Sequence, residues 1–127
     1  MKLKPILLLL FMMALPVSAE TVTPIHHLVV VWLKTDQGDD AVERYREASL
    51  PLQDLPGVLE YRVVRRAAIT RNRPNPAVDD SFDLIVDSRF ETAEALEAFL
   101  KHPEYVQIAQ QQLRPLVDHY RIYDAVE

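Results

Sequence analysis

The sequence predicts an α+β domain with the element order βαββαβ, and three observations support this prediction. Short runs rich in β-branched and apolar residues, typical of strands, lie at 25–34, 58–69, 81–89 and 116–125. Between the first and second runs, and between the third and fourth, apolar residues recur every three or four positions, as in amphipathic helices. A chain of 127 residues with 49% hydrophobic content suits one folded domain rather than a disordered segment.

The composition excludes several classes of chemistry. With no cysteine, the chain has no disulfide, thiolate nucleophile, zinc–thiolate site or iron–sulfur cluster. Its formal net charge of −5 disfavours nucleic-acid binding, which depends on clustered Lys and Arg. With only 2 glycines in the chain, a glycine-rich phosphate loop is excluded as well. We therefore predict no cofactor, no metal and no nucleic-acid partner.

Residues 1–19 are predicted to form a secretory signal peptide, which leaves a domain over 20–127. Lys2 and Lys4 precede an uncharged apolar run at 6–15, and the small residues that follow Pro16 suit cleavage after Ala19. An uncleaved anchor is the alternative, although ten helical residues span only about 15 Å of a hydrocarbon core about 30 Å thick. Cleavage removes both lysines, so the mature chain should have a net charge of −7. Because the signal peptide directs export and is then removed, we expect the mature protein to be secreted or periplasmic and not bound to the membrane.

The first strand, at 25–34, is apolar on both faces, so both faces should be covered by other parts of the protein. Successive side chains alternate between the faces, which defines two rows. One row holds His27, Val29, Val31 and Leu33, and the other holds His26, Leu28, Val30 and Trp32.

The first helix is predicted to begin near Asp39 and Asp40, whose carboxylates suit the positive end of the helix dipole. It runs to about Leu50, and Pro51 marks its exit. Its buried stripe comprises Val42, Tyr45, Ser49 and Leu52.

The second and third strands, at 58–69 and 81–89, are joined by a connection at 70–80 that is rich in Pro, Asn and Arg and long for a hairpin. The five arginines near this connection suggest a solvated edge, with a site for an anionic ligand as the alternative. In the third strand Phe82, Leu84 and Val86 share one face with Ser88, and Asp83, Ile85 and Asp87 share the other. The arginines are Arg62, Arg65, Arg66, Arg71 and Arg73.

The second helix is predicted to begin after Thr92, a suitable N-cap residue, and to end at His102-Pro103. Its apolar stripe comprises Leu96, Phe99 and Leu100. We expect His102 to cap the end of this helix. A short helical piece over 104–112 and a last strand over 116–125 complete the chain.

This order of elements is the ferredoxin-like arrangement, in which a four-stranded antiparallel sheet has helices on one face only. The other face would expose a large apolar surface, formed by Leu28, Val30, Trp32 and Ile85. Two copies packed sheet to sheet would bury that surface, so the pattern predicts a homodimer, with Trp32 as an interface anchor.

Two segments resemble the stress-responsive dimeric α/β-barrel (Dabb) family. The segment at 27–34, HLVVVWLK, is similar to the opening strand of the family, a His followed by aliphatic residues and a Lys. The segment at 90–106, FETAEALEAFLKHPEYV, resembles the family's stretch of Phe, capped helix, aromatic residue and His-Pro. The resemblance covers roughly residues 25–126.

The resemblance implies a dimeric α/β barrel with a cavity between each sheet and its helices. Some members of the family are stress-induced proteins. A polyketide-cyclising branch uses two histidines, of which the first matches His27 and the second falls on Tyr105 of this chain. Related barrels include oxygenases of quinone-like substrates and haem degraders, a link that rests on fold alone.

We therefore expect an exported Dabb-domain protein that binds a small apolar or aromatic molecule between sheet and helices. The alternative is a small cofactor-free enzyme, such as a cyclase, isomerase or monooxygenase, with His27 as general base and Tyr105 as the group that orients the substrate. A third interpretation is that His27 is buried, hydrogen-bonded and has only a structural role. The expected ligand-binding residues are His27, Val29, Tyr45, Val86, Phe99, Tyr105 and Ile108.

His26 should point to the opposite face of the sheet, toward Asp83 and Asp87 of the third strand. We interpret a His–Asp contact there as structural, with a metal site formed by His26 and these carboxylates as the alternative.

Overall fold

A computed structural model describes residues 2–3, 13–14 and 22–127. The predicted signal peptide and its cleavage after Ala19 fall in the part of the chain outside these ranges, apart from the two short described stretches. Within the described ranges, no helix combines the length and the apolar character needed to cross a membrane.

The elements follow the predicted βαββαβ order. The strands are β1 (Ile25–Leu33), β2 (Val58–Arg65), β3 (Leu84–Phe90) and β4 (Val117–Val126), and the helices are α1 (Ala41–Ser49), α2 (Ala93–Lys101) and α3 (Pro103–Ile108). Short helical turns cover η1 (Thr35–Gln37), η2 (Leu50–Asp54) and η4 (Arg114–Leu116). A π-helical turn, η3 (Ala109–Leu113), separates α3 from η4.

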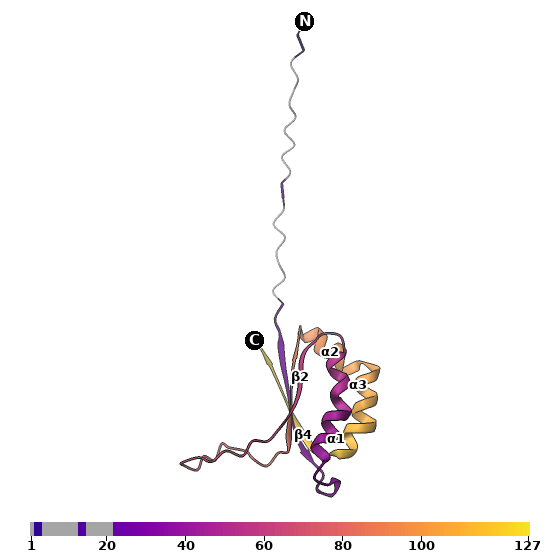
Figure 1. Cartoon of the computed structure of the whole chain (residues 1–127). Helices are drawn as coiled ribbons and strands as arrows, with labels where there is room; N and C mark the ends of the chain where they lie inside the picture. The colour runs from indigo at the N-terminus through magenta and orange to yellow at the C-terminus, as the bar shows by residue number, and fades with distance from the viewer. Residues whose placement is uncertain (1, 4–12, 15–21) are drawn as a thin grey trace.

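The four strands form one antiparallel sheet in the order β2-β3-β1-β4, which confirms the ferredoxin-like α+β fold. All the helices lie on one side of this sheet (Figure 1). The central strand β1 pairs with β3 on one side and β4 on the other, so that His27 lies opposite both Ser88 and Asp124. This register brings three distant segments together around one histidine.

The connection between β2 and β3 is longer than predicted. Regular pairing ends at Arg65 and resumes at Leu84, and a bond from the Arg66 N–H to the Asp83 carbonyl (3.2 Å) extends the ladder by one step. Further along, prolines at 74 and 76 cannot donate to a ladder, which disfavours strand pairing in the middle of the connection. The connection projects from the sheet on the side away from the helices (Figure 1).

The core lies between the sheet and the helices and follows the predicted alternation. On β3, burial alternates with every residue, so Leu84, Val86, Ser88 and Phe90 face the helices. The ring of Phe90 packs edge-on against Phe99 of α2, with 4.8 Å between ring centroids. From the helical side the core is filled by Val42, Tyr45, Leu52, Leu96, Phe99, Ile108 and Leu113. The prediction that Leu100 belongs to the buried stripe of α2 was wrong: Leu100 is 38% exposed, because it lies about 100° around the helix from Phe99, at the edge of the stripe.

The start of α2 is fixed by two local features. The Thr92 hydroxyl accepts a hydrogen bond from the Ala95 N–H (3.0 Å), which confirms Thr92 as the N-cap. Gly57, in the turn before β2, has φ +82°, and a Cβ at this position would lie 2.6 Å from the Cβ of Ala95. Only glycine allows this close approach of the turn to α2.

We predicted that His102 caps the end of the second helix, and this prediction was wrong for its side chain. The backbone N–H of His102 bonds to the Phe99 carbonyl at the end of α2, but the side chain caps the next helix. Its Nδ1 accepts from the Glu104 N–H (3.1 Å). The reason is that α3 begins at Pro103, immediately after His102, so the imidazole lies beside the free N–H groups of a helix start.

Candidate functional site

A cavity of about 380 Å³ lies between the sheet and the helices. This volume falls within the range of about 300–1,000 Å³ that is usual for small-molecule sites. Seventeen residues line the cavity, and much of its wall is apolar. The apolar lining consists of Val29, Val31, Leu52, Val86, Phe99, Ala109, Leu113, Val117 and Ile122.

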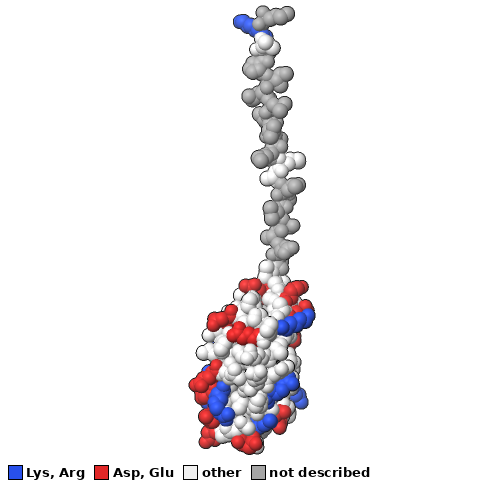
Figure 2. All heavy atoms as spheres, turned by 90° about the vertical axis from the view of Figure 1, so that its right-hand side faces the viewer, with Lys and Arg blue, Asp and Glu red and all other residues white. Residues whose placement is uncertain are grey.

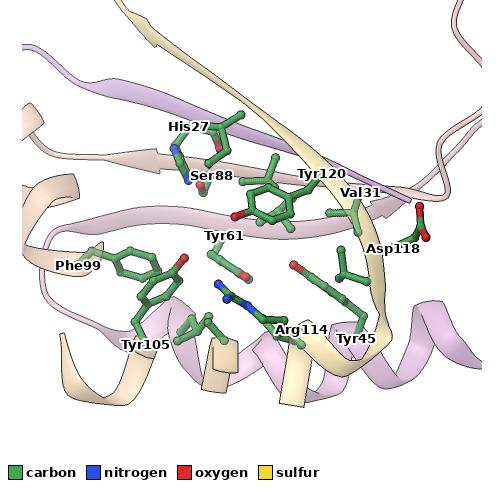
Figure 3. Close-up of a pocket in the computed structure, with 17 residues that line it drawn as sticks. His27, Val31, Tyr45, Tyr61, Ser88, Phe99, Tyr105, Arg114, Asp118 and Tyr120 are labelled. Atoms are coloured by element: carbon green, nitrogen blue, oxygen red, sulfur yellow. Dashed lines mark hydrogen bonds between the residues drawn. The ribbon is translucent and has the colours of Figure 1, made fainter. Parts of the chain in front are cut away.

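Four tyrosines from four different elements direct their rings toward this cavity (Figure 3). Tyr45 comes from α1, Tyr61 from β2, Tyr105 from α3 and Tyr120 from β4. Burial raises the pKa of Tyr61 to about 12 and raises the pKa of Tyr45 still further. The phenols of Tyr45 and Tyr61 therefore stay neutral at physiological pH, and each hydroxyl can donate a hydrogen bond to a ligand and accept one from it.

His27 lies on the sheet side of the cavity and is only 6% exposed. Its Nδ1 lies 2.5 Å from the Oδ1 of Asp124, the residue opposite it on β4. Because a carboxylate only accepts hydrogen bonds, Nδ1 carries the proton in this pair, so the lone pair of the neutral imidazole is on Nε2. The arrangement orients the imidazole as a base.

The backbone around His27 is held as firmly as its side chain. The hydroxyl of Ser88, itself buried, donates to the His27 carbonyl (2.8 Å), and the edge of the His27 ring packs against Phe90 at 6.1 Å between centroids. Two neighbouring strands thus restrict the position of this residue.

Arg114 and Asp118 lie where the helical layer meets the start of β4 and complete the polar lining. The guanidinium of Arg114 points into the cavity between Tyr45 and Tyr105 (Figure 3). Burial raises the pKa of Tyr105, and the nearby charge of Arg114 opposes that rise. The cavity thus combines an apolar wall with phenols, the Ser88 hydroxyl, one imidazole, one cation and the Asp118 carboxylate.

The structure brings six of the seven predicted ligand-binding residues to this cavity. They are His27, Val29, Tyr45, Val86, Phe99 and Tyr105. The seventh, Ile108, is buried in the core and does not line it. Ile108 follows Tyr105 by three residues, so its side chain points about 60° away from that of Tyr105 around the axis of α3. In that direction it packs into the core.

The remaining polar groups of the site were not among the predicted residues. On β4, every second residue faces the helical side, and this row contains Asp118, Tyr120 and Asp124. Since both rows of this strand mix apolar and charged residues, its pattern does not reveal which one is inward. Tyr61 did carry a signal, because it alternates in phase with the buried Val63. Ser88 shares the inward face predicted for Val86.

The expected contact of His26 with Asp83 or Asp87 is absent among the described residues. His26 bonds instead through Nε2 to Glu127 (2.9 Å), which also accepts from Arg89 (3.0 Å). The register explains this result, because His26 lies opposite Arg89 and Ala125, at the other end of β1 from Asp83. No three His, Asp or Glu side chains gather as metal ligands in the described ranges.

The face of the sheet away from the helices holds the other predicted row of β1. Trp32 stacks on His119 of β4, with ring centroids 4.4 Å apart, and donates to the Ser81 hydroxyl (3.0 Å). Leu28, Val30 and Ile85 are partly exposed on this face in the single chain. We call the four residues Leu28, Val30, Trp32 and Ile85 the open face.

Charged side chains of both signs are interspersed on the helical face of the molecule (Figure 2). Near the long connection, Arg62 pairs with Asp87 (2.8 Å) and Arg65 with Glu43 (2.8 Å). Two of the five arginines that suggested an anionic site are therefore already paired with carboxylates of the chain. Such surface ion pairs are typical of a solvated strand edge.

The fold and the site define a ferredoxin-like α+β domain with a partly open cavity between its sheet and its helices. The sequence model described as "Stress responsive A/B Barrel Domain" (Dabb) matches residues 25–127. The chain belongs to this family, which confirms the resemblance noted in its first strand and second helix. No protein with a curated description matches the sequence.

Solved structures share the fold at low sequence identity. A Dabb family protein with a ferredoxin-like fold from Mesorhizobium loti is 22% identical, with a TM-score of 0.64 over 83% of this chain and 97% of that one. A dimeric ferredoxin-like protein of unknown function from Thermobifida fusca is 14% identical, with a TM-score of 0.66 over 84% and 93% of the two chains. A hydroxynitrile lyase from Passiflora edulis is 17% identical, with a TM-score of 0.65 over 82% and 93%.

Proposed function

We propose that this protein is an exported Dabb-domain protein of the stress-responsive type that binds a small aromatic molecule. The observation that carries the proposal is the cavity, in which an apolar wall surrounds a few convergent polar groups. Phe99 and the aliphatic side chains suit a ring system, while the neutral phenols of Tyr45, Tyr61 and Tyr105 suit its oxygen substituents.

Export is supported by the N-terminal pattern of lysines, apolar run and small residues before the predicted cleavage after Ala19. The absence of cysteine is compatible with an oxidising compartment, because a domain of this size can form a sufficient core without disulfides. We place the mature protein outside the cytoplasm, in the periplasm or the medium.

We further propose that two copies associate through the open face. The helices cover one side of the sheet, and the open face lies on the other. Solved structures of this fold from Thermobifida fusca and Bacteroides fragilis are described as dimeric. A second copy would remove the partly exposed Val30 and Ile85 from water.

Binding of 2-naphthol, a neutral compound with two fused rings and one hydroxyl, tests the proposal. Isothermal titration calorimetry should give a Kd in the micromolar range for the purified protein. Ala109→Phe, which adds a ring to the cavity lining, should weaken this binding on the order of tenfold or more because it occupies the ligand's space.

Leu100→Phe is the matched control, because Leu100 lies on an exposed part of α2 and does not line the cavity. It should bind 2-naphthol like the original protein, and circular dichroism should show that both variants are folded. Equal binding by Ala109→Phe and the original protein would refute the assignment of the ligand to this cavity, and absence of binding would refute the proposed function for this probe class.

A cofactor-free enzyme is the second candidate, and the His27–Asp124 pair specifically favours it. In such an enzyme Nε2 of His27 would remove a proton from the bound molecule, while the Asp124 carboxylate stabilises the imidazolium that forms. Tyr105 or Tyr45 would donate a hydrogen bond to the oxygen on which charge develops. A neighbour of the same fold is described as a hydroxynitrile lyase, which makes an aromatic hydroxynitrile a suitable first substrate.

Turnover separates the two candidates. If the protein is an enzyme, mass spectrometry should detect conversion of an aromatic hydroxynitrile or of compounds in a metabolite extract. His27→Ala should then lower the rate by roughly 10²–10⁴-fold, and Asp124→Asn should lower it as well, while 2-naphthol still binds to both. If neither the original protein nor any variant converts these compounds, the enzyme hypothesis is rejected and the hypothesis of a ligand-binding protein is kept.

A further inference from the structure

We propose that Arg114 makes the cavity selective for an aromatic ligand that carries a carboxylate. This inference rests on the proposed function, since it specifies the class of molecule that the cavity binds. The aromatic part would lie against Phe99 and the aliphatic wall, and the carboxylate would accept hydrogen bonds from the Arg114 guanidinium.

The local structure explains why Arg114 reaches the cavity. The wide π-helical turn at 109–113 breaks the regular rotation of α3 before the short turn that begins at Arg114. Leu113 and Leu116 on either side are buried in the core, so the backbone at Arg114 is anchored. Although Arg114 is exposed to solvent, its guanidinium points toward the tyrosines of the cavity (Figure 3).

The charge of Arg114 is not neutralised within the described part of the chain. Some arginines pair with carboxylates, as Arg46 does with Glu43 and Arg89 with Glu127, whereas others in the described ranges, such as Arg71 and Arg121, make no ion pair. Asp118 lines the same cavity, yet its carboxylate bonds to His119 (2.6 Å), and no ion pair joins it to Arg114. What sets Arg114 apart from the other arginines without an ion pair is that it lines the cavity.

A carboxylate fits the groups around Arg114 better than a neutral oxygen does. The planar guanidinium offers parallel N–H donors that match both oxygens of a carboxylate, and such charge-assisted bonds are about twice as strong as neutral ones. The hydroxyls of Tyr45 and Tyr105, directed at the same space, are neutral and can donate to the same anion. His27 remains at the sheet side of the cavity.

The test compares 2-naphthoate with 2-naphthamide, which has the same rings and no charge. Isothermal titration calorimetry on the original protein should give a Kd for the naphthoate that is on the order of tenfold lower or better. Arg114→Gln should abolish this preference and leave the affinity for the amide within about twofold. Arg114→Lys should retain part of the preference, since it keeps the charge but loses the planar fork.

Arg71→Gln is the control, because it removes one positive charge from the long connection, away from the cavity. It should keep the full preference for naphthoate. Equal binding of both probes by the original protein, or a preference that survives Arg114→Gln, would overturn the inference while the proposed function stands. If neither probe binds and 2-naphthol does not bind either, the proposed function itself fails. Arg114 is exposed, so circular dichroism should show an unchanged fold in its variants.

Discussion

Replacing Phe90 with alanine should lower the free energy of unfolding by about 3–5 kcal/mol, measured by urea denaturation at fixed protein concentration. The side chain is 0% exposed and sits at the end of β3, where the core, the cavity wall and the capped start of α2 meet. Its removal leaves a void beside Phe99 (4.8 Å between centroids) and beside His27 (6.1 Å) that rigid strand pairing prevents from closing.

Leu100→Ala provides the control for this substitution. Leu100 is 38% exposed on α2, so its truncation should cost less than about 1 kcal/mol. A loss below about 1 kcal/mol for Phe90→Ala would mean that Phe90 does not hold the sheet and α2 together. Because Phe90 also packs against the His27 ring, the variant should bind 2-naphthol more weakly even where it is folded.

Val30→Asp should convert a dimer into a monomer, with the association constant lowered by roughly 100-fold or more. Val30 lies opposite Ile85 in the register, at the centre of the open face. A twofold interface would bury the new carboxylate twice, once from each copy. Arg121 lies opposite Val30 on β4 and can pair with the new carboxylate, but burial of two such ion pairs in place of apolar contacts still costs free energy. Sedimentation velocity at micromolar concentration measures the effect directly.

Leu100→Asp adds the same charge to the helical side and should leave self-association unchanged. A monomeric original protein would contradict the proposed interface, and so would a Val30→Asp variant that sediments as a dimer. The stability of the isolated fold should change little in either variant, because both positions are at least partly exposed in the single chain.

Much of the fold could be predicted from local patterns. The alternation of β1 assigned Val29 and Val31 to the helical side and Val30 to the open face, and the structure agrees. Thr92 was a reliable helix start because its hydroxyl acts on an N–H group three residues away, within the same segment. The end of β2 was predicted too far along, since nothing in the run of alanines and arginines at 65–68 marks the point where a ladder partner is lost.

The site was less predictable because its polar groups meet through pairing between distant strands. Asp124 pairs with His27 across 97 positions, and only the register between β1 and β4 places them opposite each other. Arg114 depends on a π-helical turn, for which the sequence carries no clear signal. Sequence patterns therefore predicted part of the apolar wall, His27 and two tyrosines of the cavity. The acid, the cation and the other two tyrosines, Tyr61 and Tyr120, came from tertiary structure.

A methyl NMR titration with 2-naphthol tests the central claim, that the cavity binds a small aromatic molecule, most directly. Val29 pairs with Val86 on the cavity side of the sheet, and the next pair, Val30 with Ile85, lies on the open face. We predict that aromatic ring currents shift the methyl signals of Val29 and Val86 and leave those of Val30 and Ile85 in place. Signals that do not move at saturating 2-naphthol, or that move only for Val30 and Ile85, would contradict the claim.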